Sequence, residues 1–180
     1  YILSAYARKD WSSLLGYSNN SAIAKGGALA WVVTKDILQS SKTLSFLKLR
    51  ASWGQLNATS GLGLYQNIST FGTSNYAGSL GTLPTGDNIA NPNLQFEQVE
   101  KIDLGFESKL FDNRLEVTAD YFNNTRTDLI IGGVPISGIN GGYAPGSGAP
   151  SVNAGKVKNS GFELVLNYKS NISDFKYDLG

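Results

Sequence analysis

The feature that most constrains this chain is a period-two alternation of apolar and polar side chains over long segments. In the clearest segment, Ile102, Leu104 and Phe106 alternate with charged residues such as Lys101 and Asp103. Successive side chains of a β-strand point to opposite faces, so this pattern predicts strands with one apolar and one polar face. It indicates six strands and the start of a seventh, near residues 1–9, 26–35, 45–56, 94–109, 114–127 and 156–170, and from Phe175.

The connections between these strands alternate strictly between short and long. Outer-membrane barrels have short periplasmic turns and long extracellular loops, whereas compact soluble domains rarely carry long structureless loops. Several of the strands also exceed the usual five or six residues, which suits a tilted membrane-spanning strand. The sequence therefore favours an all-β, antiparallel transmembrane β-barrel wall. The short connections are 110–114, 171–174 and 36–44, the last with room for one helical turn, and the long ones are 10–25, 57–93 and 128–155.

Composition narrows the functional classes. The 180 residues include no Cys, Met or His, only 16% are charged, and the formal net charge is +1. Without Cys and His the chain lacks disulfides, thiolate ligands, the commonest metal ligand and the commonest general base. Balanced charge also argues against a nucleic-acid interface, which needs a basic face. These absences argue against most hydrolases and metalloenzymes, although Ser, Asp, Glu and Lys could still act in catalysis. We assign no catalytic residues, metal site or cofactor, and expect a protein that is not an enzyme.

Aromatic residues cluster toward the ends of the expected strands, as in the aromatic girdles at the two membrane interfaces. Alternation alone leaves two other folds open. One is a soluble β-sandwich that binds carbohydrate at the cell surface, and the other is a β-rich glycoside hydrolase with paired carboxylates. The aromatic residues are Trp53, Phe96, Tyr121 and Phe162 toward the loop ends, and Phe46, Phe106, Phe111, Tyr168 and Phe175 toward the turn ends.

Six stretches resemble a known family in their order and spacing. Trp11 departs from the family pattern, which has Gly there. Together the stretches resemble the C-terminal barrel half of SusC/RagA-like TonB-dependent transporters of Bacteroidetes. The stretches are 8–13 (RKDWSS), 47–54 (LKLRASWG), 91–97 (NPNLQFE), 110–115 (LFDNRL) followed by 120–122 (DYF), and 153–164 (NAGKVKNSGFEL).

This resemblance implies TonB-dependent import of glycans or peptides across the bacterial outer membrane by a multi-pass barrel of about 22 strands. The expected partners are a SusD-like surface lipoprotein, TonB, the transported glycan or peptide, and membrane lipid or lipopolysaccharide. Because the chain begins at Tyr1 and ends at Gly180 within patterned segments, we expect residues 1–180 to be part of a single C-terminal barrel domain. The plug domain and the segment that contacts TonB would lie outside them.

Two groups of candidate site residues follow. The first is a lumen-facing wall whose mixed charges suggest ion pairing: Arg50, Lys101, Asp103, Glu107, Glu116, Asp120 and Glu163. The second is a set of loop aromatics that suit sugar rings or the surface of a partner protein, or alternatively pack the loops onto one another: Tyr65, Phe71, Tyr76 and Tyr143.

Overall fold

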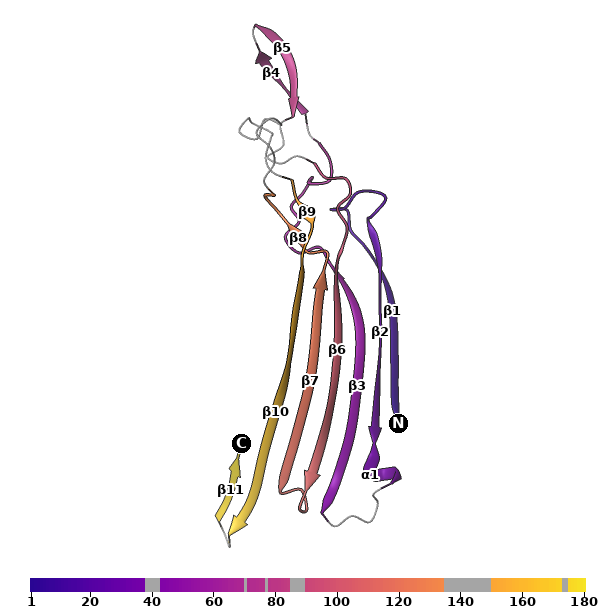
Figure 1. Ribbon diagram of the computed structural model, residues 1–180, viewed down its shortest axis with the longest axis vertical. Coiled ribbons are helices and arrows are strands. Elements are labelled where there is room, and N and C mark those ends of the chain that lie inside the picture. The colour runs from indigo at the N-terminus through magenta and orange to yellow at the C-terminus, as the bar shows by residue number, and fades with distance from the viewer. Residues whose placement is uncertain (38–42, 70, 77, 85–89, 135–149, 173–174) are drawn as a thin grey trace.

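A computed structural model of the chain describes all residues except 38–42, 70, 77, 85–89, 135–149 and 173–174. Its main element is one antiparallel sheet, and each strand pairs with the next strand of that sheet along the chain (Figure 1). In spatial order the strands are β1 (Ile2–Trp11), β2 (Ser21–Val32), β3 (Leu44–Ala58), β6 (Glu97–Leu110), β7 (Leu115–Thr127), β10 (Lys156–Ile172) and β11 (Phe175–Leu179).

The sheet has two distinct ends, as the sequence predicts. The short helix α1 (Val33–Asp36) and the tight turn at 111–114 lie at one end, which we call the turn end. The long connections lie at the opposite end, which we call the loop end (Figure 1). Phe111, Asp112 and Asn113 all have positive φ angles, and the Arg114 N–H donates to the Phe111 carbonyl at 3.1 Å. Three left-handed residues in succession reverse the chain within this short turn.

The strand register gives the sheet one polar and one apolar face. Residues directly opposite each other in an antiparallel ladder point to the same side. Lys48 pairs with Glu107, and Asp120 pairs with Glu163, on the polar face. Leu104 pairs with Ala51 and Tyr121 on the apolar face. The predicted alternation is therefore confirmed across the sheet.

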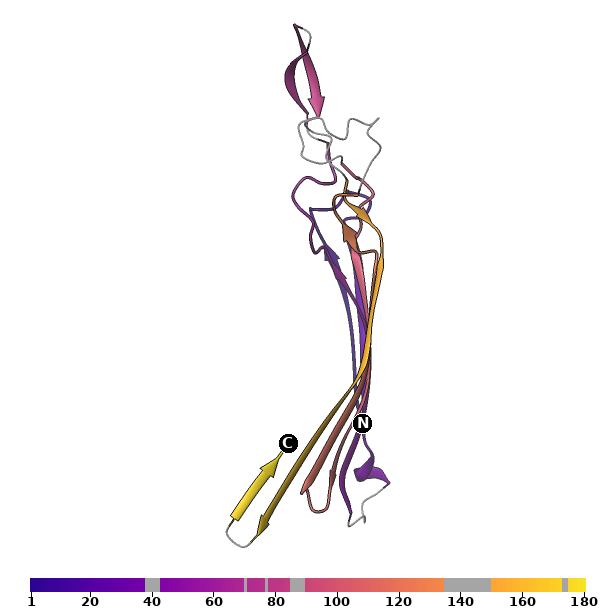
Figure 2. The same cartoon turned by 60° about the vertical axis from the view of Figure 1, so that its left-hand side comes forward.

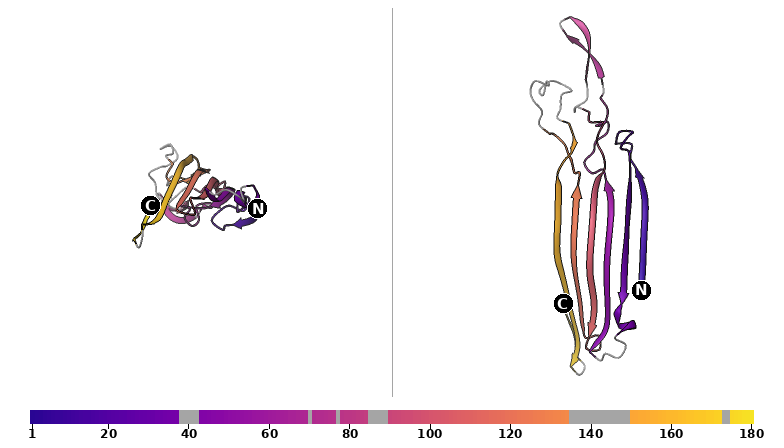
Figure 3. Two further views of the ribbon diagram at one scale, coloured as in Figure 1. Left: turned by 90° about the horizontal axis from the view of Figure 1, so that it is seen from below. Right: turned by 45° about the vertical axis from the view of Figure 1, so that its right-hand side comes forward.

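The apolar face has no second layer packed on it within the described residues. Figures 2 and 3 show a twisted single sheet rather than two stacked sheets. Leu104 is 48% exposed and Phe162 is 84% exposed. A face this apolar and this open is what a lipid-facing barrel wall presents. No helix among the described residues is long and apolar enough to cross a membrane.

Two of the predicted strands have the wrong bounds. The strand expected over 26–35 is β2, which begins at Ser21 because the pairing with β1 continues to Trp11 and Ser21. It ends at Val32 and α1 follows from Val33, so the helical turn begins before the expected range 36–44 and shares only Asp36 with it.

The strand expected over 94–109 begins only at Glu97. Leu94 and Phe96 leave the ladder and form a buried cluster with Leu15, against which Leu62 and Ile130 pack. This cluster lies among the connections at the loop end. Phe96 is therefore part of a small core rather than of a girdle, and Phe46, which pairs with Lys109, shares the polar face.

The sequence predicts loops for the long connections, but they contain regular structure. The hairpin of β4 (Phe71–Tyr76) and β5 (Ser79–Pro84) projects farthest from the sheet at the loop end (Figure 1). A shorter ladder joins β8 (Ile130–Ile131) to β9 (Val152–Asn153) above β7 and β10.

Candidate functional site

The predicted wall residues share the polar face of the sheet. They come from four neighbouring strands, β3, β6, β7 and β10, and the ladders carry each of them to the same side. Basic and acidic residues occur on this face in equal numbers. They are Arg8, Lys48, Arg50, Lys101, Lys109, Arg126, Lys169 and Lys176 against Asp10, Glu97, Asp103, Glu107, Glu116, Asp120, Glu163 and Asp178.

Arg50 lies at the centre of an ion-pair network on this face. Its Nε donates to Asp120 Oδ1 at 3.1 Å and its Nη2 contacts Asp120 Oδ2 at 2.5 Å. Its Nη1 contacts Glu107 Oε1 at 3.0 Å, and Lys48 Nζ reaches the same oxygen at 3.4 Å. One guanidinium thus joins carboxylates on two different strands, the geometry for which arginine is suited.

Gly105 makes room for this network. It lies on β6, between Arg50 on β3 and Asp120 on β7, and pairs with both. A Cβ atom at this position would overlap Asp120 Oδ1 and lie 2.8 Å from Arg50 Nε. Only glycine therefore lets the arginine cross the intervening strand without displacing its partner.

The remaining predicted wall residues form fewer salt bridges and side-chain hydrogen bonds. Lys109 Nζ contacts Glu116 Oε1 at 3.0 Å, and Ser52 Oγ donates to Asp103 Oδ2 at 3.4 Å. Within the described residues, Lys101 and Glu163 form no salt bridge.

A hollow of about 600 Å³ opens on the polar face beside Arg50. Its carboxylates can accept hydrogen bonds, and its amides can both accept and donate them. This combination suits a hydroxyl-rich or peptide-like group. No group of three or more Asp or Glu residues among the described residues could hold a metal ion. The hollow is lined by Arg50, Ser52, Asp103, Asp120, Phe122, Asn124, Asn159 and Glu163.

Of the predicted loop aromatics, the structure describes the side chains of Tyr65 and Phe71. Tyr65 is 66% exposed and Phe71 is 64% exposed, so neither packs the loops as the alternative interpretation required. Tyr76 lies at the end of β4, and Tyr143 lies outside the described residues. No stacking or tilted ring contact joins Tyr65 to Phe71 within the described part of the chain.

Sequence reasoning missed an ion pair with a buried carboxylate at the loop end. The side chain of Glu97 is 3% exposed, and its Oε2 contacts Arg126 Nη2 at 2.5 Å. Its Oε1 accepts the backbone N–H of Ile130 at 2.9 Å, and Ser60 Oγ donates to Oε2 at 3.3 Å. Glu97 therefore holds the start of the β3–β4 connection and the start of the β7–β10 connection together.

The amides of Asn91 and Asn153 extend this anchoring. Asn153 Oδ1 accepts the N–H of Gln95 at 2.9 Å, and Asn153 Nδ2 donates to the Gln95 carbonyl at 2.8 Å. Asn91 Nδ2 donates to the Ser151 carbonyl at 2.8 Å. The stretches 91–97 and 153–164 are separate motifs of the same family resemblance. That both belong to it is the sequence signal that could have indicated this cluster.

The turn end carries a second polar contact, outside the strands. Trp31 Nε1 donates to Asp36 Oδ2 at 2.7 Å. This bond, and then a hydrogen bond from Tyr1, hold the pKa of Asp36 below its usual range. The contact fixes α1 to the end of β2.

The whole chain matches one protein family. Residues 1–180 match the family model described as TonB dependent receptor-like, β-barrel. TonB-dependent receptor P3 of Formosa agariphila is 32% identical over 174 residues, which cover 94% of this chain and 17% of that protein. TonB-dependent receptor P26 of the same organism is 27% identical over 175 residues, covering 93% of this chain and 16% of that protein. The chain thus spans about a sixth of the length of these relatives.

Solved structures give the same fold. The RagAB peptide importer in its open-open state superposes with a TM-score of 0.81 and 27% identity, over 97% of this chain and 18% of the compared chain. The closed-closed state gives a TM-score of 0.79 and 26% identity over 96% of this chain and 18% of that chain. The siderophore receptor PirA of Pseudomonas aeruginosa shares the fold alone, with a TM-score of 0.51 and 15% identity over 91% of this chain and 29% of that chain.

Proposed function

This chain belongs to the TonB dependent receptor-like β-barrel family, whose barrels sit in the bacterial outer membrane, and from that premise we propose that it forms part of the wall of a SusC/RagA-like importer. The family is one of transporters and receptors rather than of enzymes. In this proposal residues 1–180 are part of a larger C-terminal barrel domain, the protein catalyses no reaction, and the plug lies elsewhere in the full-length protein.

One observation carries the proposal. The sheet has an exposed apolar face without a second layer among the described residues, and an opposite face where Arg50, Glu107 and Asp120 pair across strands. A closed barrel wall needs this combination, because one face meets lipid and the other meets water or a plug. A β-sandwich, the second candidate, would need another sheet to cover the apolar face.

In this proposal the polar face lines the lumen. Lys48 and Arg50 with Glu107 and Asp120 form a neutralised scaffold, whereas Lys101 and Glu163 remain available to contact the plug or a passing substrate. The mixed charge suits a substrate with both donors and acceptors rather than a simple ion. Glycans and peptides both have this chemistry, and the structural relatives are described as a peptide importer.

The partners are also part of the proposal. A SusD-like surface lipoprotein would lie over the loop end, and the exposed side chains of Tyr65 and Phe71 offer it, or the substrate, an aromatic contact. Energy would come through TonB, contacted by a segment outside residues 1–180.

The test uses the full-length protein in its native host. Cell membranes are fractionated, and the protein is extracted with and without detergent and run on gels before and after heating. We expect it in the outer-membrane fraction, soluble only in detergent, with a heat-sensitive shift in mobility. Recovery of the full-length protein as a detergent-free soluble monomer would contradict the barrel assignment.

A second measurement tests transport itself. Uptake of labelled peptide and glycan pools is compared between the wild-type strain, a strain lacking this gene and a strain lacking TonB. We expect uptake of one pool to fall equally in both deletion strains. If the strain lacking this gene takes up both pools as well as the wild type does, the result would contradict import.

A further inference from the structure

Charge is distributed very differently on the two faces of the sheet. Basic and acidic residues balance on the polar face, but the apolar face carries four lysines and one glutamate. All five lie at the loop end, in the rows of side chains beyond Trp53 and Ile102. They are Lys9 on β1, Lys25 on β2, Glu100 on β6, and Lys156 and Lys158 on β10.

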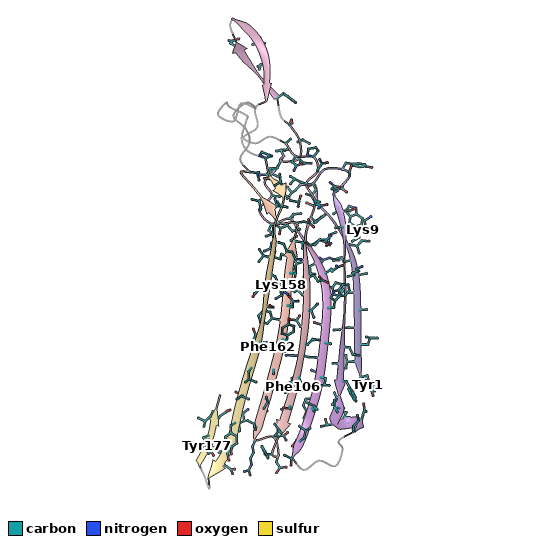
Figure 4. All side chains as sticks on the ribbon, in the orientation of Figure 1. Tyr1, Lys9, Phe106, Lys158, Phe162 and Tyr177 are labelled. Atoms are coloured by element: carbon teal, nitrogen blue, oxygen red, sulfur yellow. The ribbon has the colours of Figure 1, made fainter. Side chains whose placement is uncertain are left out.

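The rows can be followed through the ladders. Ala7, Lys25, Gln55, Glu100, Thr125 and Lys158 are successive partners across the sheet and so lie at one level. Lys9 and Lys156 lie two residues farther toward the loop end of their strands. Figure 4 shows Lys9 and Lys158 above Phe162, Phe106 and Tyr1 along the sheet.

The opposite end of the apolar face has no such charge. From the level of Ile102 down to Leu110, the ladder positions of this face within the described residues carry no charged residue. Tyr168 and Tyr177 lie there instead, with ring centroids 6.1 Å apart. The two ends of the apolar face therefore present different chemistry, tyrosine at the turn end and lysine at the loop end.

The lysines adjoin the apolar band at the height of a membrane surface. Ile102 and Leu110 are eight residues apart on β6, or about 27 Å along a strand and less along the normal to the membrane if the strand is tilted. Outer-membrane barrels present an apolar band about 25 Å tall. The next row, with Lys25 and Lys158, then lies at the level of the lipid headgroups.

The lysine ammonium groups are open to an external anion. All four lysines are exposed, and none forms a salt bridge within the described residues. Glu100 forms no salt bridge with any of them within the described residues and accepts a hydrogen bond from Trp53 Nε1 at 2.8 Å, and one carboxylate leaves the four lysines in excess. Lys9 Nζ lies 4.9 Å from the ring centroid of Trp11 and Lys25 Nζ lies 6.0 Å from that of Trp53, so tryptophan rings hold two of the lysines near the boundary.

We propose that Lys9, Lys25, Lys156 and Lys158, which we call the lysine belt, bind the phosphate groups of lipid headgroups in the outer leaflet. Lysine is a point-charge ligand for phosphate, and anionic headgroups attract basic side chains held at the membrane surface. Four lysines against one engaged carboxylate complement that charge. This inference rests on the proposed placement of the apolar face against lipid, with the loop end outside the cell.

The test compares two variants of the full-length protein with the same change in formal charge. The belt variant is K9Q/K25Q/K156Q/K158Q. The control variant, K35Q/K101Q/K169Q/K176Q, leaves the belt intact and removes four lysines that lie off the apolar face, on α1 and on the polar face of the sheet. Both are extracted, stripped of lipid in a neutral detergent and checked for the heat-sensitive gel shift of the folded barrel.

Binding is then measured by native mass spectrometry with diphosphorylated lipid A, with dephosphorylated lipid A of the same acyl chains, and with inorganic phosphate. We expect the wild type and the control to prefer the phosphorylated lipid, and the belt variant to bind it at least about tenfold more weakly. Raised salt should weaken the wild-type preference, because exposed charges are screened.

Equal affinity of the belt and control variants for the phosphorylated lipid would overturn the inference. Binding of inorganic phosphate as tight as that of the lipid would assign the lysines to a free anion instead, and would overturn the lipid assignment. If the protein is a detergent-dependent barrel without a preference for phosphate, only this inference is overturned. If the protein is soluble without detergent, the proposed function is overturned as well.

Discussion

Arg50 and Asp120 form a two-point ion pair across an intervening strand, and they meet because residue 105 between them is glycine. The two residues are 70 positions apart in the chain, yet two bonds join the guanidinium to the carboxylate. The pair ties β3 to β7 over β6, whereas backbone hydrogen bonds join only neighbouring strands. The Arg50–Asp120 ion pair thus links three strands through side chains on the polar face, and we call this link the brace.

Replacing Gly105 with alanine should break this brace. The added Cβ would overlap Asp120 Oδ1 and crowd Arg50 Nε, so the carboxylate must move away from the guanidinium. Because the pair is partly exposed, we expect a loss of about 0.5–1 kcal/mol in the free energy of unfolding. The measurement is the urea concentration at half-unfolding of the detergent-folded barrel.

A double-mutant comparison isolates the cause. Gly105→Ala should cost clearly less when Asp120 is already alanine, because the carboxylate that it displaces is gone. An equal cost in both backgrounds would mean that the methyl group acts through the backbone of β6 rather than through the ion pair.

An added lysine should lower the folding yield far more on one face of β6 than on the other. Leu104 lies on the apolar face and Asp103, its neighbour in the chain, lies on the polar face. A charge on the lipid face near the middle of the membrane costs about 2–4 kcal/mol, whereas one on the lumen face stays solvated. Leu104→Lys should therefore lower the folding yield into detergent much more than Asp103→Lys, as scored by the gel shift. Equal yields would contradict the assignment of the faces.

The local pattern of the sequence was enough to predict the sheet. Alternation depends only on neighbours along one strand, so it predicted which residues of 45–56 and 114–127 share a face. The connection 110–114 was predicted as a tight turn from its length alone. Family resemblance then indicated the kind of barrel, in agreement with the family match.

The features that were not predicted depend on residues far apart in the chain. Leu94 and Phe96 continue the alternation of β6, and only their packing against Leu15 takes them out of the ladder. In the alternation Gly105 is one more position of the polar face, and only the register places it between Arg50 and Asp120. No local pattern shows which carboxylate a basic side chain reaches from two strands away.

Glu97 should matter more than any other carboxylate of the strands that is paired in the structure. Its side chain is buried and accepts from Arg126, Ser60 and the Ile130 N–H, so Glu97→Ala removes the acceptor that these three donors share. We expect a loss of about 1–3 kcal/mol, confined to the loop end. Limited proteolysis should cleave the connections after β3 and β7 faster while the sheet stays intact.

Glu116→Ala is the matched control, because Glu116 also forms a single salt bridge, to Lys109, but its side chain at the turn end is 31% exposed against 3% for Glu97. Its removal should cost clearly less than that of Glu97, since exposed ion pairs contribute little to stability, and should leave the loop-end cleavage unchanged. Equal cleavage in the two variants would show that Glu97 does not hold the connections together.

The exposed loop aromatics should affect capture without affecting stability. Tyr65 and Phe71 project from the loop end with about two thirds of their surface open, so truncating them removes little packing. We expect Tyr65→Ala and Phe71→Ala to change the free energy of unfolding by less than about 0.5 kcal/mol. If these rings contact substrate or the lipoprotein, half-saturation of uptake should move to a concentration several-fold higher with little change in the maximal rate. Tyr17→Ala removes a ring that is even more open, 95% exposed, from the β1–β2 connection and serves as the control. The same shift in all three variants would mean that losing any exposed ring has this effect, whereas a shift only at Tyr65 and Phe71 locates capture above β3 and β6.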